Sequence, residues 1–376
     1  MPDAPTRESL LPTLRRTLDL AAAQAQRVLD HHPGYTPMYT VGGKWNREGE
    51  RWTHWCEGFF PGILWLLHKH TGDARWRGPA EQLSRALEPR RFDRNVHDLG
   101  FLFLSTYLRW FHLTGEPAVR DVLIDAGRTL ALRQQKGGYL ASFVAPESLF
   151  IDIMMNVGII FWAARATDDA ALWQVALDHC RTTARTLVRG DGGTAHEGIF
   201  DLATGAFVKQ TTHQGWRGDT TWSRGLAWSL YGFTSAYRFT GEREFLDVAR
   251  ANADFWLRRS PPTLVPPWDF DLPADLPPTV DSSAAAIAAS GLLDLSEATT
   301  DPGEQARYHT AALTILQTLC TDDYVPFHRP EWEGILMHGI YHYHKNLAVD
   351  ESVAWGEHFF VEALVKAAAG HSAAGW

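Results

Sequence analysis

Apolar residues along the chain form two kinds of segment that alternate. In LGFLFLSTYLRWF, residues 99–111, apolar side chains cover nearly every position, which predicts a helix buried on all sides. In the next segment, residues 117–135, apolar side chains recur every three or four positions with charges between them, which predicts a helix with one face in solvent. Short polar turns such as HTGDARW and FTGEREF separate the segments and supply N-cap and first-turn acidic residues. Each such pair of segments is therefore predicted to be a helical hairpin.

The hairpins are expected to close into a ring. An (α/α)6 barrel of six inner and six outer helices buries every inner helix without an open end, provided that the last arm pairs with the first. An open solenoid would need polar end caps, and the sequence has none. We therefore predict an all-α fold, an (α/α)6 barrel of six helical hairpins, as a single catalytic domain over residues 1–376. The predicted helices are 8–31, 54–71, 74–89, 97–113, 117–135, 148–166, 169–188, 221–239, 243–259, 280–298, 303–321 and 351–369.

Two connections are too long to be simple turns, and long connections often carry function. Residues 188–220 contain alternating segments around a glycine-containing turn, which favours a small β-hairpin. Residues 260–279 are rich in proline and are predicted to be non-helical. Both are expected to cap one mouth of the barrel.

Composition restricts the partners and the compartment. The chain has 376 residues, 45% of them hydrophobic, enough for one large core or two medium ones. A net charge of -9 without a basic run argues against nucleic acid or an anionic membrane as partner. No secretory signal or long apolar span is evident, and three distant cysteines fit free thiols in a reducing compartment, so we predict a cytoplasmic protein.

Candidate chemistry gathers where the inner helices begin. These helices run in the same direction, so their first turns should meet at one end of the barrel. Asp152 interrupts a strongly apolar segment, and Asn156 follows four residues later, about 6 Å away on the same helical face. A buried Asp can be purely structural, bonded to backbone amides. With Asp98 at the same mouth, however, the two pKa values should move apart and give one proton donor and one anion, the minimum for acid/base catalysis on a sugar. The residues at these helix starts are Glu57, His97, Asp98, Asp152, Trp222, Arg224, Asp281, Ser352 and Trp355.

Aromatic and basic side chains are dense near the same end. A flat tryptophan face can stack on a sugar ring, and Trp55, Trp222, Trp228 and Trp268 are the candidates, whereas Trp65 and Trp110 are expected in the core. A metal site is the competing interpretation of the histidines, but the chain has no HExxH motif or paired Cys/His spacing, so we predict no metal and no cofactor. Histidines with Arg224 and Lys345 suit hydrogen bonding to a carboxylate or hydroxyls. The histidines are His196, His213, His338, His342 and His344.

A set of motifs resembles one known family. WCEGFFPGILWL, HDLGF, IDIMMN, THQG, TWSRGLAW, WDF followed by DSSAAAI, and WGEHFFVEAL occur in this order between about residues 50 and 369. Together they resemble the unsaturated glucuronyl hydrolases, glycoside hydrolase family 88. The resemblance implies an (α/α)6 barrel that removes a 4,5-unsaturated uronic acid from the non-reducing end of lyase-generated oligosaccharides. In that reaction an Asp protonates C4, water adds at C5, and the hemiketal opens.

The resemblance also implies roles for individual residues. Asp152 matches the family's general acid/base and Asp98 its partner. The positions that match substrate contacts are Trp55, His97, His196, His213, Gln214, Trp222, Arg224 and Trp228. Residues 338–346, HGIYHYHKN, depart from the family's usual segment near the second sugar, which leaves the leaving-group sugar and its sulfation open, along with the roles of His338, His342, His344 and Lys345.

The sequence also allows three other functions. A sugar epimerase on a similar barrel would use histidines as acid and base, and a non-catalytic oligosaccharide-binding protein would have no need of paired buried carboxylates. Hydrolysis of unsaturated rhamnogalacturonan units is a third alternative. The expected partner is an oligosaccharide ending in an unsaturated uronic acid, and the expected assembly is a monomer or simple homo-oligomer.

Overall fold

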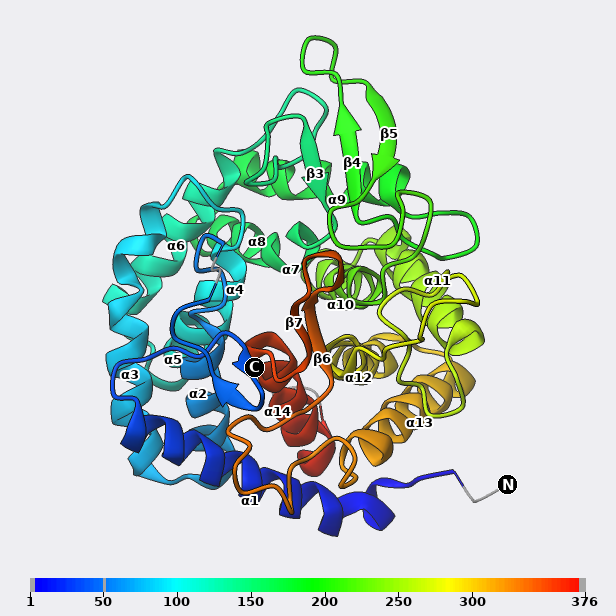
Figure 1. Cartoon of the computed structure of the whole chain (residues 1–376). Helices are drawn as coiled ribbons and strands as arrows, with labels where there is room; N and C mark the ends of the chain where they lie inside the picture. Colours follow the sequence, from blue (N-terminus) through cyan, green and yellow to red (C-terminus); the bar gives the residue numbers. More distant parts are fainter. Residues whose placement is uncertain (1–3, 50–51, 372–376) are drawn as a thin grey trace.

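The helices form two concentric rings in a computed structural model that describes residues 4–49 and 52–371 (Figure 1). Within these residues the inner ring runs from α2 to α14, and α14 packs against both α2 and α1, so the last arm pairs with the first as predicted. The (α/α)6 barrel is thereby confirmed. The inner helices are α2 (Phe59–Thr71), α4 (Leu99–Phe103) with α5 (Arg109–Thr114), α7 (Ile153–Asn156) with α8 (Gly158–Thr167), α10 (Ser223–Thr240), α12 (Ser282–Ala298) and α14 (Ala354–Ala369). The outer helices are α1 (Arg7–His31), α3 (Arg77–Ala86), α6 (Pro117–Ala131), α9 (Ala170–Leu187), α11 (Arg243–Arg259) and α13 (Pro302–Leu319).

The turn signals in the sequence mark the helix ends. Gly72 and Gly241, with φ of 69° and 73°, end the inner helices α2 and α10 in the left-handed conformation that glycine adopts without strain. Side chains of Asp169 and Asp301 accept hydrogen bonds from backbone N–H groups in the first turns of α9 and α13. Local chemistry therefore fixes where these two outer arms start.

Two inner arms are interrupted, although their patterns predict continuous helices. A π-helical segment, η3 (Leu104–Leu108), lies between α4 and α5, and a single residue, Val157, separates α7 from α8. The start of α4 also comes very close to the end of the single-turn helix α7, since a Cβ on Gly100 would lie 2.4 Å from the Cα of Asn156. This approach places the residues just before the two helices, Asp98 and Asp152, at the same mouth.

Short strands cap that mouth. The predicted hairpin within 188–220 is confirmed as β4 (Glu197–Phe200) and β5 (Phe207–Thr211), joined by β3 (Ser148–Phe150) in an antiparallel sheet of order β3-β4-β5. Two further hairpins, β1 (Thr40–Val41) with β2 (Lys44–Trp45) and β6 (Gly339–His342) with β7 (Leu347–Glu351), were not predicted as strands. The predicted helix starts at 148 and 351 were wrong, because both residues pair in sheets and the helices begin at 153 and 354. The 3-10 turns are η1 (Ala74–Trp76), η2 (Glu88–Phe92) and η4 (Tyr343–Lys345).

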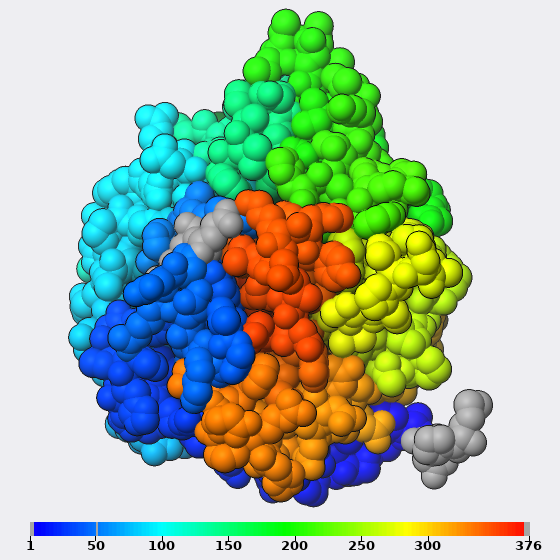
Figure 2. Space-filling view, viewed as in Figure 1, coloured from blue at the N-terminus to red at the C-terminus, as the bar shows by residue number. Residues whose placement is uncertain are grey.

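The β6–β7 hairpin lies at the centre of the capped face. In Figure 2 its orange-red atoms are surrounded by the blue segment before α2, the green β4–β5 region and the yellow proline-rich connection. Residues 260–279, which follow the end of α11, contain no helix, as the proline content predicted. Their only strand-like pairings are isolated bridges, such as that of Trp222 with Asp269. Segments distant in sequence thus build one surface over the barrel.

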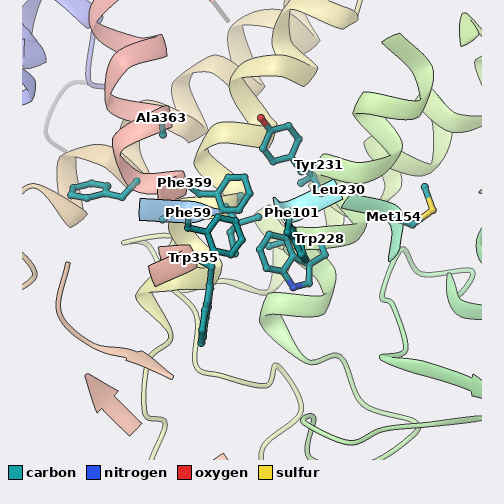
Figure 3. Packing of buried hydrophobic residues seen from close by; sticks show 14 of the residues in the cluster. Phe59, Phe101, Met154, Trp228, Leu230, Tyr231, Trp355, Phe359 and Ala363 are labelled. Atoms are coloured by element: carbon teal, nitrogen blue, oxygen red, sulfur yellow. The ribbon is translucent and has the colours of Figure 1, made fainter. Parts of the chain in front are cut away.

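Aromatic side chains fill the barrel beneath this surface (Figure 3). Phe59 from α2 packs against Phe101 from α4 with ring centroids 5.4 Å apart, and Trp228 from α10 packs against Phe359 from α14 at 5.3 Å. Trp65 and Trp110 are stacked in the core, as predicted. The barrel interior is therefore packed with side chains below the mouth, and a ligand-sized cavity lies at the mouth.

Candidate active site

A cavity of about 300 Å³ opens at the mouth where the inner helices begin. It joins buried carboxyls, basic groups and an aromatic wall from six parts of the chain. The described residues that line it are Trp52, Trp55, His97, Asp98, Phe143, Val144, Phe150, Asp152, His213, Gln214, Arg224, Tyr341, His342 and Lys345. The space is sufficient for a sugar ring and part of its neighbour.

Asp98 is held beside its sequence neighbour at the start of α4. Its carboxyl is buried, and Oδ1 lies 3.3 Å from Nε2 of His97. The backbone N–H of Phe143 donates to Nδ1 of His97 at 2.9 Å, so the ring proton is on Nε2, facing Asp98. The other oxygen, Oδ2, has no hydrogen-bond partner among the described residues.

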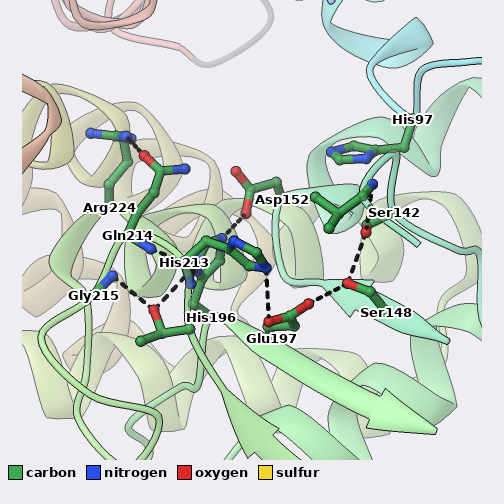
Figure 4. Close-up of polar contacts among 12 residues, drawn as sticks. His97, Ser142, Ser148, Asp152, His196, Glu197, His213, Gln214, Gly215 and Arg224 are labelled. Atoms are coloured by element: carbon green, nitrogen blue, oxygen red, sulfur yellow. Dashed lines mark hydrogen bonds and ion pairs between the residues drawn. The ribbon is translucent and has the colours of Figure 1, made fainter. Parts of the chain in front are cut away.

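Asp152 follows strand β3 and has an equivalent arrangement (Figure 4). Its Oδ2 lies 3.6 Å from Nε2 of His196 and accepts no hydrogen bond within the part of the chain described. Nδ1 of His196 accepts from the backbone N–H groups of His213, at 3.1 Å, and Gln214, at 3.2 Å. Burial lowers the pKa of His196 well below its ordinary value, and neighbouring positive charges add to the effect. Each carboxyl is therefore faced by the Nε2–H of a neutral, buried imidazole.

Both carboxyls bind protons more tightly than an exposed Asp. Burial raises the pKa of Asp98 to about 8, with the charge of Asp152 as the next cause. Burial also raises the pKa of Asp152 to about 6, although the Arg224 guanidinium opposes the rise. The two values are separated as predicted, but the higher one belongs to Asp98. The pair therefore retains one proton at neutral pH in the ligand-free protein.

The shared helical face suggested that Asn156 lies beside the Asp152 carboxyl. Instead, its side chain bonds backbone groups. Its Nδ2 donates to the backbone oxygen of Asp152 at 3.1 Å, and its Oδ1 accepts from the backbone N–H of Phe101 at 2.7 Å. Asn156 thus holds the backbone of the two carboxyl-bearing segments together.

Arg224 lies in the cavity wall between two tryptophan rings. Its guanidinium carbon is 4.4 Å from the ring of Trp222 and 5.0 Å from that of Trp355. The guanidinium pairs with Asp281 at 3.2 Å and donates to Oε1 of Gln214 at 2.5 Å, as well as to backbone oxygens of β6. Arg224 therefore positions Gln214 and the β6–β7 hairpin while contributing positive charge to the cavity.

The chain is similar to known proteins over most of its length. Residues 25–259 match the sequence model of Glycosyl Hydrolase Family 88. The chain belongs to this family. It is 34% identical to the unsaturated glucuronyl hydrolase of Bacillus sp. (strain GL1) over 327 residues, 84% of this chain and 86% of the relative.

Solved structures show the same fold for this family 88 glycoside hydrolase. The crystal structure of the unsaturated glucuronyl hydrolase from Bacillus sp. GL1 superposes with a TM-score of 0.89 at 30% identity, covering 96% of this chain and 98% of that one. A structure of an Asp-to-Asn variant, described as UGL with dGlcA-Glc-Rha-Glc, superposes with a TM-score of 0.88 at 30% identity, covering 95% and 97%.

The cavity of the family 88 enzyme brings together most of the site residues predicted from sequence. Seven of them line it: Trp55, His97, Asp98, Asp152, His213, Gln214 and Arg224. Of the open positions, His342 and Lys345 line it too, whereas His338 pairs with Asp350 and His344 bonds the backbone oxygen of Gly215.

Several predicted sugar contacts do not line the cavity, because their side chains lie behind its wall. Trp228 is fully buried against Phe101 and Phe359, since it lies more than a turn inside α10. Trp222 packs against His196 at 4.6 Å, and both are buried outside the cavity lining, so His196 acts on the site through residues that do line it, such as Asp152. Trp268 stacks on Tyr343 in the cap. The helix-start residues Glu57, Asp281, Ser352 and Trp355 also lie outside the lining.

Sequence reasoning missed the remaining wall residues, Trp52, Phe143, Val144, Phe150 and Tyr341. Phe150 and Tyr341 lie on strands β3 and β6, whose pairing depends on distant segments. Trp52 had a signal in WTHW, the stretch that also holds Trp55.

Across residues 4–49 and 52–371, no group of three or more His, Cys, Asp or Glu side chains could hold a metal ion. None of the helices described there is long and apolar enough to cross a membrane.

Proposed function

We propose that the protein removes a 4,5-unsaturated uronic acid from the non-reducing end of oligosaccharides produced by polysaccharide lyases. The observation that carries the proposal is the pair of buried carboxyls, Asp98 and Asp152, each with an oxygen lacking a hydrogen-bond partner among the described residues, on one aromatic-walled cavity. The relative named unsaturated glucuronyl hydrolase and the related variant structure with dGlcA-Glc-Rha-Glc support the substrate class. Membership of family 88 does not favour a sugar epimerase.

The reaction is a hydration of the C4=C5 vinyl ether. Protonated Asp152 donates its proton to C4, and positive charge develops at C5 and the ring oxygen. Water adds to C5, and its proton returns to the Asp152 carboxylate, so the enzyme ends the step unchanged. The resulting hemiketal opens by cleavage of the bond between C5 and the ring oxygen, and the hemiacetal left at C1 then expels the shortened saccharide.

Substrate binding favours the protonated form of Asp152, which the reaction needs. The free protein keeps its tighter-bound proton on Asp98, because that carboxyl has the higher pKa. A uronate anion entering the cavity raises the pKa of Asp152 from about 6, since a nearby negative charge favours the neutral acid. After proton transfer, Nε2–H of His196 stabilises the Asp152 anion across 3.6 Å.

The second sugar is expected against the wall formed by Lys345 and His342, with Lys345 Nζ 4.3 Å from the ring of Trp52. A positive group there suits a sulfated or carboxylated neighbour. Unsaturated rhamnogalacturonan units remain the alternative substrate. We further propose a single catalytic domain over residues 1–376, a monomer or simple homo-oligomer, a cytoplasmic location, and action without a cofactor or nucleic acid.

A substrate panel tests the proposal. Purified protein is incubated with lyase products of chondroitin, hyaluronan, heparin, gellan, xanthan, ulvan and rhamnogalacturonan, and the loss of the conjugated double bond is followed with release of the saccharide. In D₂O, early product should carry one deuterium at C4, because the enzyme delivers a solvent-derived proton there. Failure to consume any panel member, or release of saccharide with the double bond intact, would contradict hydration.

A further inference from the structure

Glu197 on β4 is a buried carboxylate next to the cavity that the proposed reaction does not use. It is 2% exposed, does not line the cavity, and lies beside His196 in the chain. Its Oε2 lies 3.3 Å from Nε2 of His213, and its Oε1 accepts from Ser148 Oγ at 2.5 Å. Burying a carboxylate is costly unless each oxygen is compensated, and here both are.

The hydrogen bonds around Glu197 all point in one direction (Figure 4). The backbone N–H of Val144 donates to Ser142 Oγ at 3.2 Å, Ser142 Oγ donates to Ser148 Oγ at 2.8 Å, and Ser148 Oγ donates to Glu197. A carboxyl that only accepts is an anion. The chain of donors therefore fixes Glu197 as a carboxylate and ties it to the cavity wall at Val144.

His213 is the group on which this carboxylate acts. Its side chain is 46% exposed and lines the cavity, while Nε2 faces Glu197. Nδ1 has no partner within the described part of the chain. If the ring were neutral with its proton on Nε2, Nδ1 would be an acceptor and would repel a substrate carboxylate; only the imidazolium offers a second N–H.

The surroundings of His213 decide its charge. The hydrogen bond to Glu197 raises the pKa of His213, partial burial lowers it, and the Glu197 charge raises it again. Positive charge from Lys345 on η4 lowers the pKa. The ring also faces His196 on β4 at 6.4 Å and shares the cavity with His342 on β6. Asp98 and Asp152 line the same cavity as His213, but Glu197 is the carboxyl that bonds the ring directly and favours its charged form.

We propose that Glu197 is a positioning residue that holds His213 as an imidazolium, with Nδ1–H available to the carboxylate of the uronic acid. The inference rests on the proposed function for the identity of that anion. It assigns part of the enzyme's preference for an acidic sugar to a residue that does not touch the substrate. Gln214, next in the chain, is held separately by Arg224.

The test begins with the ligand-free enzyme. Isotope-edited NMR of the His213 ring should show that Glu197→Gln lowers its titration midpoint by at least about one pH unit, the size of one charge-assisted contact. Asp219→Asn is the matched control, because Asp219 lies in the same connection but is exposed and pairs with Arg217. It should leave the midpoint unchanged. An unchanged midpoint in Glu197→Gln would overturn the proposal.

Kinetics then separate positioning from general structural support. At neutral pH, Glu197→Gln should raise KM for an unsaturated disaccharide about tenfold and change kcat by less than about threefold. In the His213→Ala background the same substitution should have little further effect, because both act through one group. Equal losses in both backgrounds would refute the coupling. If Glu197→Gln does not fold, Glu197→Asp should shift the His213 midpoint in the same direction by a smaller amount, because the shorter side chain draws the carboxylate away from Nε2. No shift in that variant would refute the proposal. The NMR result needs no substrate, so an inactive wild type with the expected midpoints would refute only the proposed function.

Discussion

Asn156 accepts a hydrogen bond from the backbone N–H of Phe101 at 2.7 Å and so joins the start of α4 to the single-turn helix α7. The same side chain donates to the backbone oxygen of Asp152 at 3.1 Å, and Gly100 packs directly on the Asn156 backbone. Asp98 precedes one of these helices and Asp152 the other. The relative position of the two carboxyls therefore depends on a residue that touches neither.

Asn156→Ala should reduce kcat about tenfold or more while changing KM less, because the substrate still binds but the acid is displaced. It should also lower the free energy of unfolding by about 1–3 kcal/mol, since it leaves a buried N–H unbonded. Asn252→Ala is the matched control: Asn252 is buried and bonds the backbone of Gly192, away from the cavity. It should lose similar stability in urea unfolding but keep kcat. Equal kcat losses in both variants would contradict a positioning role.

The pH dependence of activity follows from the two raised pKa values. Because the pKa is about 8 for Asp98 and about 6 for Asp152, the ligand-free pair holds one proton between these two pH values. We predict that kcat/KM falls about tenfold per pH unit above the upper of these values, where the last proton is lost. A rate that keeps rising above pH 8 would be inconsistent with an acid in this pair.

Asp98→Asn should stabilise the protein at high pH. Because the folded-state pKa of Asp98 lies above its ordinary value, the folded protein binds this proton more tightly than the unfolded chain, and wild-type stability falls as pH rises from 3.8 to about 8. Asparagine cannot ionise, so the variant should exceed the wild-type Tm by at least about 2 °C at alkaline pH. The gain should disappear near pH 4. Melting curves at both pH values check this, and a pH-independent difference would argue against the raised pKa.

Two tryptophans near the site should behave differently. Trp55 lines the cavity, so Trp55→Ala should raise KM about tenfold through lost stacking on the sugar. Trp228 is buried against Phe101, so Trp228→Phe should lower stability and leave KM unchanged. Steady-state kinetics and thermal melts on both variants would show the contrast. A larger KM change in the Trp228 variant would place the sugar elsewhere.

The sequence predicted the parts of the site that depend on local pattern. His97 and Asp98 lie at the start of an inner helix that the apolar pattern placed within about two residues. Asp152 was found because it interrupts an apolar segment, although the helix there was predicted to begin at 148 and begins at 153. Trp228 was misplaced because its depth in the barrel depends on how α10 packs against its neighbours. The strand containing Phe150 was read as helix because its partner, Glu197 on β4, lies far along the chain. Glu197 itself has no local signal, since a single Glu after a His is typical of many surface loops.

The most direct measurement of the central claim compares wild type with Asp152→Asn on an unsaturated disaccharide, following the ultraviolet absorbance of the C4=C5 double bond. The account predicts that wild type removes this absorbance and that the variant, with the same fold and a similar KM, loses at least about a hundredfold in kcat, the contribution of a general acid. A variant that consumes the double bond at the wild-type rate would contradict the account.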